Sequence, residues 1–211
     1  MSCACESGYE YHDLVDCISS ALDARDPYTG DHSRRVSDMA CALCGVLGLS
    51  AQQTQEIHIA GHLHDIGKIG IPDSVLLKEG KLNDEEWKLM KRHPQIGADI
   101  LSKSPHFMRI AAVILHHHER FDGLGYPFGA KGEEIPLGAR IIAVCDSIDA
   151  MASKRAYRDA LPLEKVRAEI ERCSGTMYDP AVAKAMLDNW GIVEETYKGK
   201  PLKTGLKREN G

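Results

Sequence analysis

The stretch HSRRVSDMACALCGVL, residues 32–47, has the residue spacing of an amphipathic α-helix. Its apolar residues recur at intervals of three and four, which places their side chains on one face of a helix. The residues on this face are Val36, Met39, Ala40, Leu43 and Leu47. His32 lies four residues before the first of them, so we expect its imidazole to point toward a helical core.

The same spacing recurs along nearly the whole chain and predicts an all-α protein. The sequence shows neither a convincing alternating strand pattern nor an internal repeat. We therefore expect a compact bundle of about eight or nine helices. Besides the first stretch, the predicted helices cover residues 11–25, 53–67, 83–92, 94–102, 107–115, 141–148, 163–173 and 180–190.

The longest irregular segment, residues 121–136, is rich in Gly and Pro. A loop of this length in a compact helical domain is usually functional. The 211 residues fit one domain and can bury a substantial core without disulfides. We expect a flexible N-terminus over residues 1–10, a single domain over 11–192, and a polar, mobile tail over 193–211.

The charge of the chain limits its partners. The formal net charge is −5 at pH 7, so no basic field attracts DNA, RNA or an anionic membrane surface. An anionic ligand must then be held by local positive charge, for which bound metal is one source. No apolar run is long enough to span a membrane, and the N-terminus lacks the features of a signal peptide, so we expect a cytoplasmic protein.

The seven cysteines are an odd, scattered set. Cys41 and Cys44 have the C-x-x-C spacing, but they lie in a helical pattern with no second pair nearby. We expect reduced, partly buried thiols at these positions rather than a zinc or redox site.

Ten histidines stand out in the composition, and several are placed to face the core. His64 follows Ala60 and Gly61, whose small side chains allow another helix to approach closely. His118 extends an apolar stripe by one turn, and Asp146 has apolar helical neighbours, which suit an ionised carboxylate only if a cation or donor meets it. A single core-facing histidine is usually structural, but several together with aspartates favour a divalent metal such as Mn, Fe, Zn or Ni.

Lys68 follows His64 by four residues and Asp65 by three. On a helix this spacing puts its amine one turn beyond both residues, on the same side. An ammonium beside a metal site can bind a substrate phosphate or protonate a leaving oxygen. The alternative is a surface lysine at a helix C-terminus, where the helix dipole stabilises it.

Three motifs occur in order along the chain: His64-Asp65-Ile66-Gly67-Lys68, His117-His118-Glu119 and Gly125-Tyr126-Pro127. This combination resembles the HD-GYP domain, the bacterial branch of the HD phosphohydrolases that hydrolyses cyclic di-GMP. The resemblance runs from about Ala21 to Leu187 and includes the segments 26–30, 93–97 and 139–146. Each motif alone is weak evidence, whereas all of them in this order are very specific.

The resemblance implies two divalent metal ions that share one ligand. The first ion would be held by His32, His64, Asp65 and Asp146. The second ion would share Asp65 as a bridge and be held by His93, His117 and His118. Some members of the family bind a third ion through a Glu four residues before the first His, where this chain has Tyr28. We therefore expect two ions, Fe or Mn foremost, with Ni, Zn or Mg as alternatives.

The other five histidines match no ligand of the family pattern. We expect structural or surface roles for His12, His58, His62, His106 and His116.

The activity that the resemblance implies is hydrolysis of cyclic di-GMP to linear pGpG, which some members of the family continue to GMP. A hydroxide bridging the two ions would attack phosphorus, with Asp65 and Lys68 in the catalytic roles.

Two segments are implied in substrate binding. Gly125 and Tyr126 lie in the Gly-Tyr-Pro loop, where the tyrosine offers a ring and a hydroxyl. Arg155 and Arg158 lie in a segment similar to the phosphate-contacting stretch of the family, and guanidinium groups suit phosphate oxygens. Ala156 stands where the family usually has Pro, which weakens the assignment of the two arginines.

The sequence leaves two alternatives open. Within the enzyme class, 3′,3′-cyclic GMP-AMP is an alternative substrate, because no guanine-reading residue can be identified. From a different class, the domain could be a cyclic di-GMP sensor or a protein-binding module with little turnover. Regulatory protein partners, a homodimer, and membership of a longer regulator are also left open.

Overall fold

The computed structural model describes residues 11–25, 31–154 and 159–198. Within these ranges the chain forms eleven α-helices, three short 3₁₀ segments and no β-strand. The helices α1 to α11 are, in order, Tyr11–Arg25, His32–Val46, Ala51–Leu63, Asp73–Leu76, Asp84–Met90, His93–Leu101, Met108–His116, Leu137–Ala152, Leu163–Arg172, Pro180–Asp188 and Gly191–Tyr197. The 3₁₀ segments η1 to η3 are Ile66–Gly70, Pro105–Phe107 and Gly132–Glu134. None of the described helices has both the length and the apolar composition that a membrane span requires.

The all-α prediction is confirmed, and each of the nine predicted helices has a counterpart. The two helices that were not predicted are α4, which has only four residues, and α11, whose one fully buried residue, Val193, forms no apolar stripe. Helix α11 overlaps the beginning of the segment 193–211 that was expected to form a tail. Residues 193–197 are helical because Val193 packs into the core and the Tyr197 hydroxyl donates to Asp149 at 2.6 Å.

Helix α3 differs from its prediction at both ends. It begins at Ala51, because the Ser50 hydroxyl accepts the backbone N–H of Gln53 while the Gln53 side chain accepts the backbone N–H of Ser50. It ends at Leu63 rather than at residue 67, and the chain turns into η1. The change from α-helix to the tighter 3₁₀ geometry therefore falls at residues 64 and 65.

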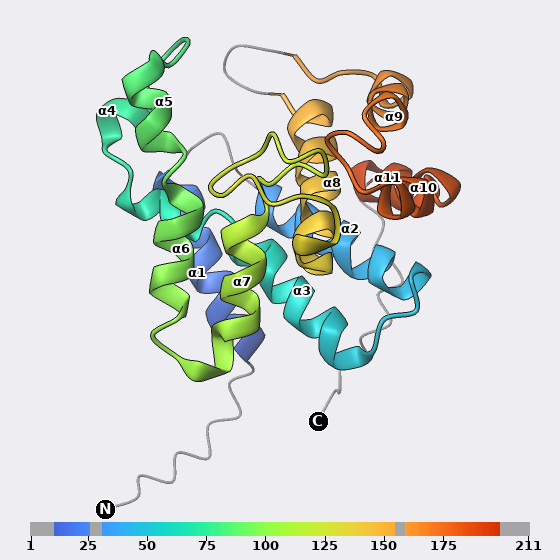
Figure 1. The fold of residues 1–211 in the computed structure, drawn as a ribbon, viewed down its shortest axis with the longest axis horizontal. Helices are drawn as coiled ribbons and strands as arrows, with labels where there is room; N and C mark the ends of the chain where they lie inside the picture. Colours follow the sequence, from blue (N-terminus) through green and yellow to red (C-terminus); the bar gives the residue numbers. More distant parts are fainter. Residues whose placement is uncertain (1–10, 26–30, 155–158, 199–211) are drawn as a thin grey trace, which may run out of the picture.

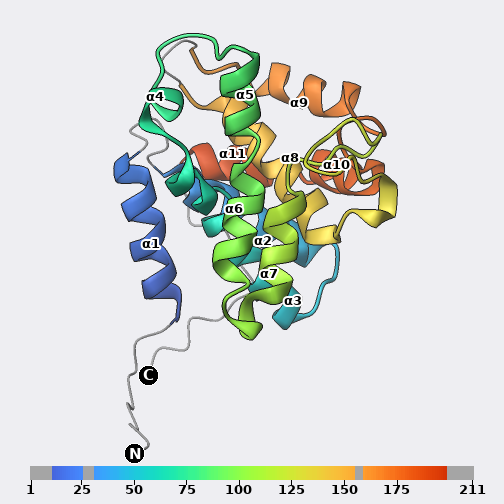
Figure 2. The ribbon, with the colours of Figure 1, turned by 60° about the vertical axis from the view of Figure 1, so that its left-hand side comes forward.

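Helices α2, α3 and α8 pack against one another in the middle of the molecule (Figure 1). Helices α6 and α7 lie side by side on one flank, where α7 contacts α3. Helices α9, α10 and α11 cover the other flank, and α11 packs on α2. Figure 2 shows α1 along one edge, where it contacts α3 and η1. The segments that carry the predicted metal ligands thus come from the middle and from the flank that α6 and α7 form.

The predicted core face of α2 is buried. The residues on it that have no exposed surface are Val36, Met39, Ala40 and Leu43. Helix α3 approaches this helix closely, since a Cβ added to Gly61 would lie 2.7 Å from the Cα of Ser37. The close approach predicted from the small residues before His64 is therefore confirmed.

Cys41 and Cys44 are free thiols, and both are buried. Burial raises the pKa of the Cys41 thiol to about 11 and that of Cys44 to about 12. At neutral pH neither residue offers the thiolate that metal binding or redox chemistry needs.

Candidate metal centre

Four of the predicted ligand histidines are buried at helix ends that meet in the interior. His32 and His93 begin α2 and α6, whereas His64 and His117 follow the last residues of α3 and α7. In each ring Nδ1 lies within 2.6–2.9 Å of an oxygen. The oxygens are Asp149 Oδ2 for His32, Gly61 O for His64, Met90 O for His93 and Ile114 O for His117. Because these oxygens accept, each Nδ1 carries the proton and Nε2 is the atom left for a metal.

The first donor group consists of His32, His64, Asp65 and Asp146. The Nε2 atoms of His32 and His64 are 3.2 Å apart. Asp146 Oδ1 lies 3.4 Å from His32 Nε2 and 4.0 Å from His64 Nε2, and Asp65 Oδ2 lies 3.5 Å from His64 Nε2. Atoms bound to one ion at about 2.0–2.2 Å lie roughly 3–3.5 Å from one another, so these separations fit one ion with little adjustment.

The second donor group consists of Asp65, His93, His117 and His118. One ligand atom from each of these side chains lies within 4.8 Å of all the others. Asp65 Oδ1 is 3.3 Å from His93 Nε2, which is 3.4 Å from His117 Nε2. Asp65 therefore turns Oδ2 toward the first group and Oδ1 toward the second, which is the orientation of a bridging carboxylate.

The charges of the centre favour a bound cation. Burial, together with neighbouring imidazoles, lowers the pKa of His117 and His118 well below the usual range, and burial lowers the pKa of His93. The Nε2 lone pairs of His93 and His117 therefore face each other with no proton between them. Although burial favours the neutral acid, Lys68 and the histidines hold the pKa of Asp65 well below its usual range, so the carboxylate is charged. Neutral imidazole with carboxylate is a donor set that fits divalent metals.

Lys68 lies beside the shared carboxylate, but it does so from η1 rather than from an α-helix. Its Nζ is 2.7 Å from Asp65 Oδ2. Residues three apart eclipse each other in a 3₁₀ helix, so the predicted neighbourhood persists although α3 ends early. The Arg25 guanidinium holds the same segment, since it donates to the carbonyls of Lys68 at 3.1 Å, Ile69 at 2.5 Å and Ile71 at 2.6 Å.

No role was predicted for Asp149, which binds His32 of the first donor group at Nδ1, the ring nitrogen that is not left for a metal. Its carboxylate is 1% exposed and accepts from His32 Nδ1 at 2.7 Å, Arg35 Nε at 2.5 Å and the Tyr197 hydroxyl at 2.6 Å. Although burial opposes ionisation, His32 and Arg35 hold the pKa of Asp149 well below its usual range. The sequence signal that could have found Asp149 is its position one helical turn after Asp146 on α8. Its partners lie on α2 and α11, so the spacing within α8 does not indicate them.

The Gly-Tyr-Pro loop packs over the second donor group. The Tyr126 N–H donates to the His118 carbonyl at 3.2 Å, and the two ring centroids are 4.9 Å apart. Glu119 Oε1 accepts the Phe128 N–H at 2.7 Å, while its buried Oε2 has no hydrogen-bond partner among the described residues. A Cβ on Gly125 would lie 2.5 Å from the Cα of Glu119, so the approach requires glycine. The loop thus brings Gly125 and Tyr126, two of the four predicted substrate-binding residues, to the second donor group, and their contact with substrate stays a prediction.

The family model for the HD domain matches residues 16–182, a range that contains every predicted metal ligand. This chain belongs to the HD-domain family. The family membership predicted from the sequence is therefore confirmed.

Known relatives of this HD-domain protein share most of its length. A cyclic di-GMP phosphodiesterase from Thermotoga maritima is 43% identical over 195 residues, which cover 90% of this chain and 53% of the relative. A 3′3′-cGAMP-specific phosphodiesterase 2 from Vibrio cholerae is 38% identical over 180 residues, which cover 84% of this chain and 34% of the relative. The chain thus spans between a third and about half of the length of these relatives.

The fold is also shared with a solved structure. The crystal structure of a cyclic GMP-AMP specific phosphodiesterase in V. cholerae matches with a TM-score of 0.69 at 20% identity. The match covers 87% of this chain and 50% of the other chain. At this identity the likeness concerns the fold.

Some predicted features lie outside the described residues of the HD domain. They are Tyr28, Arg155, Ala156 and Arg158, together with the side chain of His12.

The histidines that match no ligand also take no part in either donor group of the described residues. His58 Nδ1 lies 2.7 Å from the Ser37 hydroxyl, and His116 Nδ1 donates to the Ala112 carbonyl at 2.8 Å. His62 is buried and lies 3.6 Å from Asp16. These local contacts fit the structural roles expected for them.

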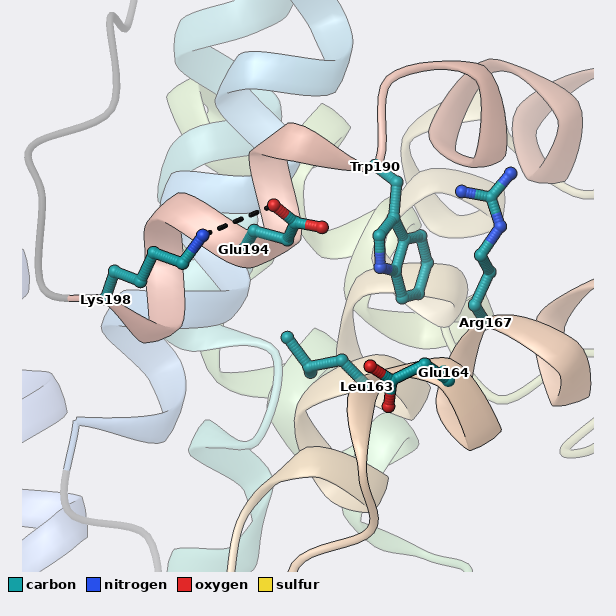
Figure 3. Close-up of a pocket in the computed structure, with 6 residues that line it drawn as sticks. All are labelled: Leu163, Glu164, Arg167, Trp190, Glu194 and Lys198. Atoms are coloured by element: carbon teal, nitrogen blue, oxygen red, sulfur yellow. Dashed lines mark hydrogen bonds and ion pairs between the residues drawn. The ribbon is translucent and has the colours of Figure 1, made fainter.

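A groove between α9 and α11 lies apart from the metal centre (Figure 3). Its lining residues are Leu163, Glu164, Arg167, Trp190, Glu194 and Lys198. Arg167 lies over the Trp190 ring, 5.7 Å from its centroid, and Lys198 pairs with Glu194 at 3.4 Å. The groove contains no predicted site residue.

Proposed function

We propose that this HD-domain protein is a metal-dependent phosphodiesterase that hydrolyses cyclic di-GMP to linear pGpG. The observation that supports this most strongly is the sharing of Asp65 between two donor groups. Its Oδ2 lies 3.5 Å from His64 Nε2, while its Oδ1 lies 3.3 Å from His93 Nε2. Paired metal ions about 3.5–4 Å apart are the arrangement that many phosphodiester hydrolases use.

Two ions would be held by the seven side chains of the two donor groups. The ligands are His32, His64 and Asp146 on one side, His93, His117 and His118 on the other, and Asp65 between them. Fe or Mn is expected, with Ni, Zn or Mg as alternatives, because imidazole and carboxylate accept all of these metals. When bound, two such ions supply activated water and the positive charge that offsets the charge developing on the phosphate.

Lys68 is the one ammonium group that the described structure places against the shared carboxylate, 2.7 Å from Asp65 Oδ2. In the proposed hydrolysis a water oxygen bonds to phosphorus and the bond from phosphorus to the 3′ oxygen breaks. The released 3′ oxygen must take up a proton, and the phosphate stays on the 5′ side as in pGpG. The Lys68 ammonium can bind a phosphate oxygen or donate that proton.

The second candidate substrate is 3′,3′-cyclic GMP-AMP. The relatives named for cyclic di-GMP and for cGAMP are 43% and 38% identical to this chain, so identity alone separates the two substrates weakly. The two molecules differ in one purine, whereas the phosphodiester chemistry at the metal centre is the same for both.

The decisive experiment is hydrolysis of both cyclic dinucleotides by metal-free protein reloaded with Fe(II) or Mn(II). Products are separated by chromatography, and the bound metal is counted by elemental analysis. We expect pGpG and two metal ions per chain. Clearly fewer than two ions would contradict the paired site, and binding without turnover under every metal would favour a cyclic di-GMP sensor.

Two variants control this experiment. Asp65→Ala removes the shared carboxylate and should abolish turnover together with loss of bound metal. Lys68→Met leaves every metal ligand in place, so it should retain both ions while hydrolysis falls by about 10²–10⁴-fold, the range typical of proton-transfer groups. If Lys68→Met hydrolyses substrate as the wild type does, the role given to this ammonium is wrong.

A further inference from the structure

One cationic side chain near the metal centre contacts two aromatic rings. Lys91 Nζ is 5.3 Å from the centroid of the Tyr126 ring and 5.7 Å from that of Trp87. Trp87 belongs to α5, and Lys91 caps the C-terminus of the same helix. Tyr126 comes from the Gly-Tyr-Pro loop, so the tertiary fold, and not helical spacing alone, assembles this ring–ammonium–ring cluster.

The cluster adjoins the second donor group on two sides. Its Tyr126 ring lies 4.9 Å from the His118 ring, and Lys91 precedes His93 by two residues. Trp87 is 44% exposed, which leaves aromatic surface open to solvent beside the Lys91 ammonium. Among the described residues no carboxylate pairs with the Lys91 ammonium, whereas Lys88 on the same helix pairs with Glu85 at 2.7 Å.

A cyclic dinucleotide presents two phosphodiesters and two bases, and only one phosphodiester reacts at a time. The second phosphodiester is also an anion, and it meets a protein whose net charge is −5. It therefore needs a local cation that the metal ligands do not supply. A base beside it can stack on an aromatic ring, an interaction that tolerates any base because every base has a π-face.

We infer that Trp87, Lys91 and Tyr126 form the subsite for the half of the cyclic dinucleotide that does not react. Lys91 binds the second phosphodiester, and Trp87 stacks on a purine base. This inference rests on the proposed function and deepens it. It also means that the subsite selects cyclic dinucleotides as a class, since neither ammonium nor indole face distinguishes guanine from adenine.

The first test compares two lysine variants of the metal-loaded protein on two substrates. Bis(p-nitrophenyl) phosphate has one phosphodiester and no base, so it reaches the metal centre without using the subsite. Lys91→Met should raise KM for cyclic di-GMP about tenfold while kcat falls less, because it removes a charge-assisted contact to the second phosphodiester. The loss on cyclic di-GMP should exceed that on bis(p-nitrophenyl) phosphate by a similar factor.

Lys88→Met is the matched control, because it removes the same charge from the same helix at a side chain that is 70% exposed. It should leave the kinetics on both substrates at wild-type values. Metal content is measured for both variants, and Lys91→Met should keep its ions although it lies near His93. Equal losses on the two substrates, or no loss on either, would overturn the role of Lys91.

The second test reads the stacking contact directly. The chain has two tryptophans, Trp87 and Trp190, and the second lies in the groove between α9 and α11 (Figure 3). In stopped-flow mixing, cyclic di-GMP should quench the tryptophan fluorescence of the wild type before product forms. Trp87→Phe keeps a ring and Trp190, yet it should lose the quenching. Equal quenching in the two proteins would show that the base does not stack on Trp87.

The outcomes separate the two proposals. If the wild type hydrolyses cyclic di-GMP while Lys91→Met and Trp87→Phe both behave like Lys88→Met, the subsite is wrong and the proposed function stands. If the wild type neither binds nor hydrolyses either cyclic dinucleotide, the proposed function is wrong and the subsite assignment fails with it.

Discussion

Replacing Asp149 with Asn should weaken metal binding at the first donor group and also destabilise the fold. The substitution keeps the shape of the side chain but removes its charge and one of its two acceptor oxygens. In the wild type both oxygens are used: Oδ2 accepts from His32 Nδ1 at 2.7 Å, and Oδ1 accepts from Arg35 Nε at 2.5 Å and from the Tyr197 hydroxyl at 2.6 Å. An amide nitrogen can only donate. In the Asn variant, either the His32 N–H or the donors of Arg35 and Tyr197 would therefore point at another donor in place of an acceptor.

The size of both effects follows from these contacts. Hydrogen bonds to charged groups contribute about 1.5–3 kcal/mol each, and breaking a buried ion pair from one side costs about 3–5 kcal/mol. The Arg35 side chain is 19% exposed and can regain some water, so we expect the lower end, a loss of about 3 kcal/mol in the free energy of unfolding. For the metal, loss of the group that orients a ligand histidine typically lowers affinity by about 10–100-fold.

The two effects are measured separately. Urea denaturation of the metal-free protein gives the stability change, and calorimetric titration with Mn(II) gives the affinity. Tyr197→Phe is the control, because it removes one donor and leaves the carboxylate bound to His32. It should cost about 1 kcal/mol of stability and change metal affinity far less than Asp149→Asn does. If Asp149→Asn binds Mn(II) as tightly as the wild type, Asp149 does not orient His32.

Three further predictions concern the loop, the thiols and the metal. Glu119→Ala removes the acceptor of the Phe128 N–H, so hydrogen exchange in residues 121–136 should become faster by about tenfold; unchanged exchange would show that this contact does not order the loop. Cys41 and Cys44, whose pKa values burial raises to about 11 and about 12, should resist alkylation until the protein unfolds, as followed by mass spectrometry. Rapid labelling of the native protein would contradict their burial. Chelation should lower the free energy of unfolding by about 2.7 kcal/mol for each ion present at a hundred times its Kd, and identical thermal transitions with and without chelator would argue against a bound metal.

Helical spacing predicts the bulk of the fold because the core of this protein consists of amphipathic helices. The face of α2 that the sequence marks as apolar is fully buried from Val36 to Leu43. Spacing fails where a helix is too short or too sparsely buried to show a period, which is the case for α4 and α11. Spacing also places the C-terminal end of α3 too late, because residues 64–67 keep the pattern of a helix while the backbone tightens into a 3₁₀ turn.

Helical spacing predicts less of the candidate site than of the fold. Spacing alone pointed to His32, His64 and His118 as core-facing, whereas the roles of His93 and His117 were predicted only by the family resemblance. His93 is the first residue of α6 and His117 follows the last residue of α7, so both stand at helix ends, as His32 and His64 do. The spacing within one helix does not predict that these four helix ends meet in the interior. The partners of Asp149 were out of reach because they lie on other helices, 117 residues away in the case of His32.

A single local interaction explains why helix ends suit these ligands. His64, His93 and His117 each donate Nδ1–H to the carbonyl three residues earlier, at 2.7, 2.9 and 2.6 Å. Those carbonyls belong to the last turn of α3, α5 and α7, where backbone acceptors lack partners within their helix. The contact therefore gives a carbonyl of the last helical turn a hydrogen-bond donor and also fixes the tautomer of the ring, which leaves Nε2 free for a cation. His32 begins α2, and its Nδ1 donates to the Asp149 carboxylate from α8 instead of to a backbone carbonyl. This difference makes His32 the ligand whose orientation depends on tertiary packing, and it explains why Asp149, rather than any residue near the other three histidines, is the substitution that tests the centre most directly.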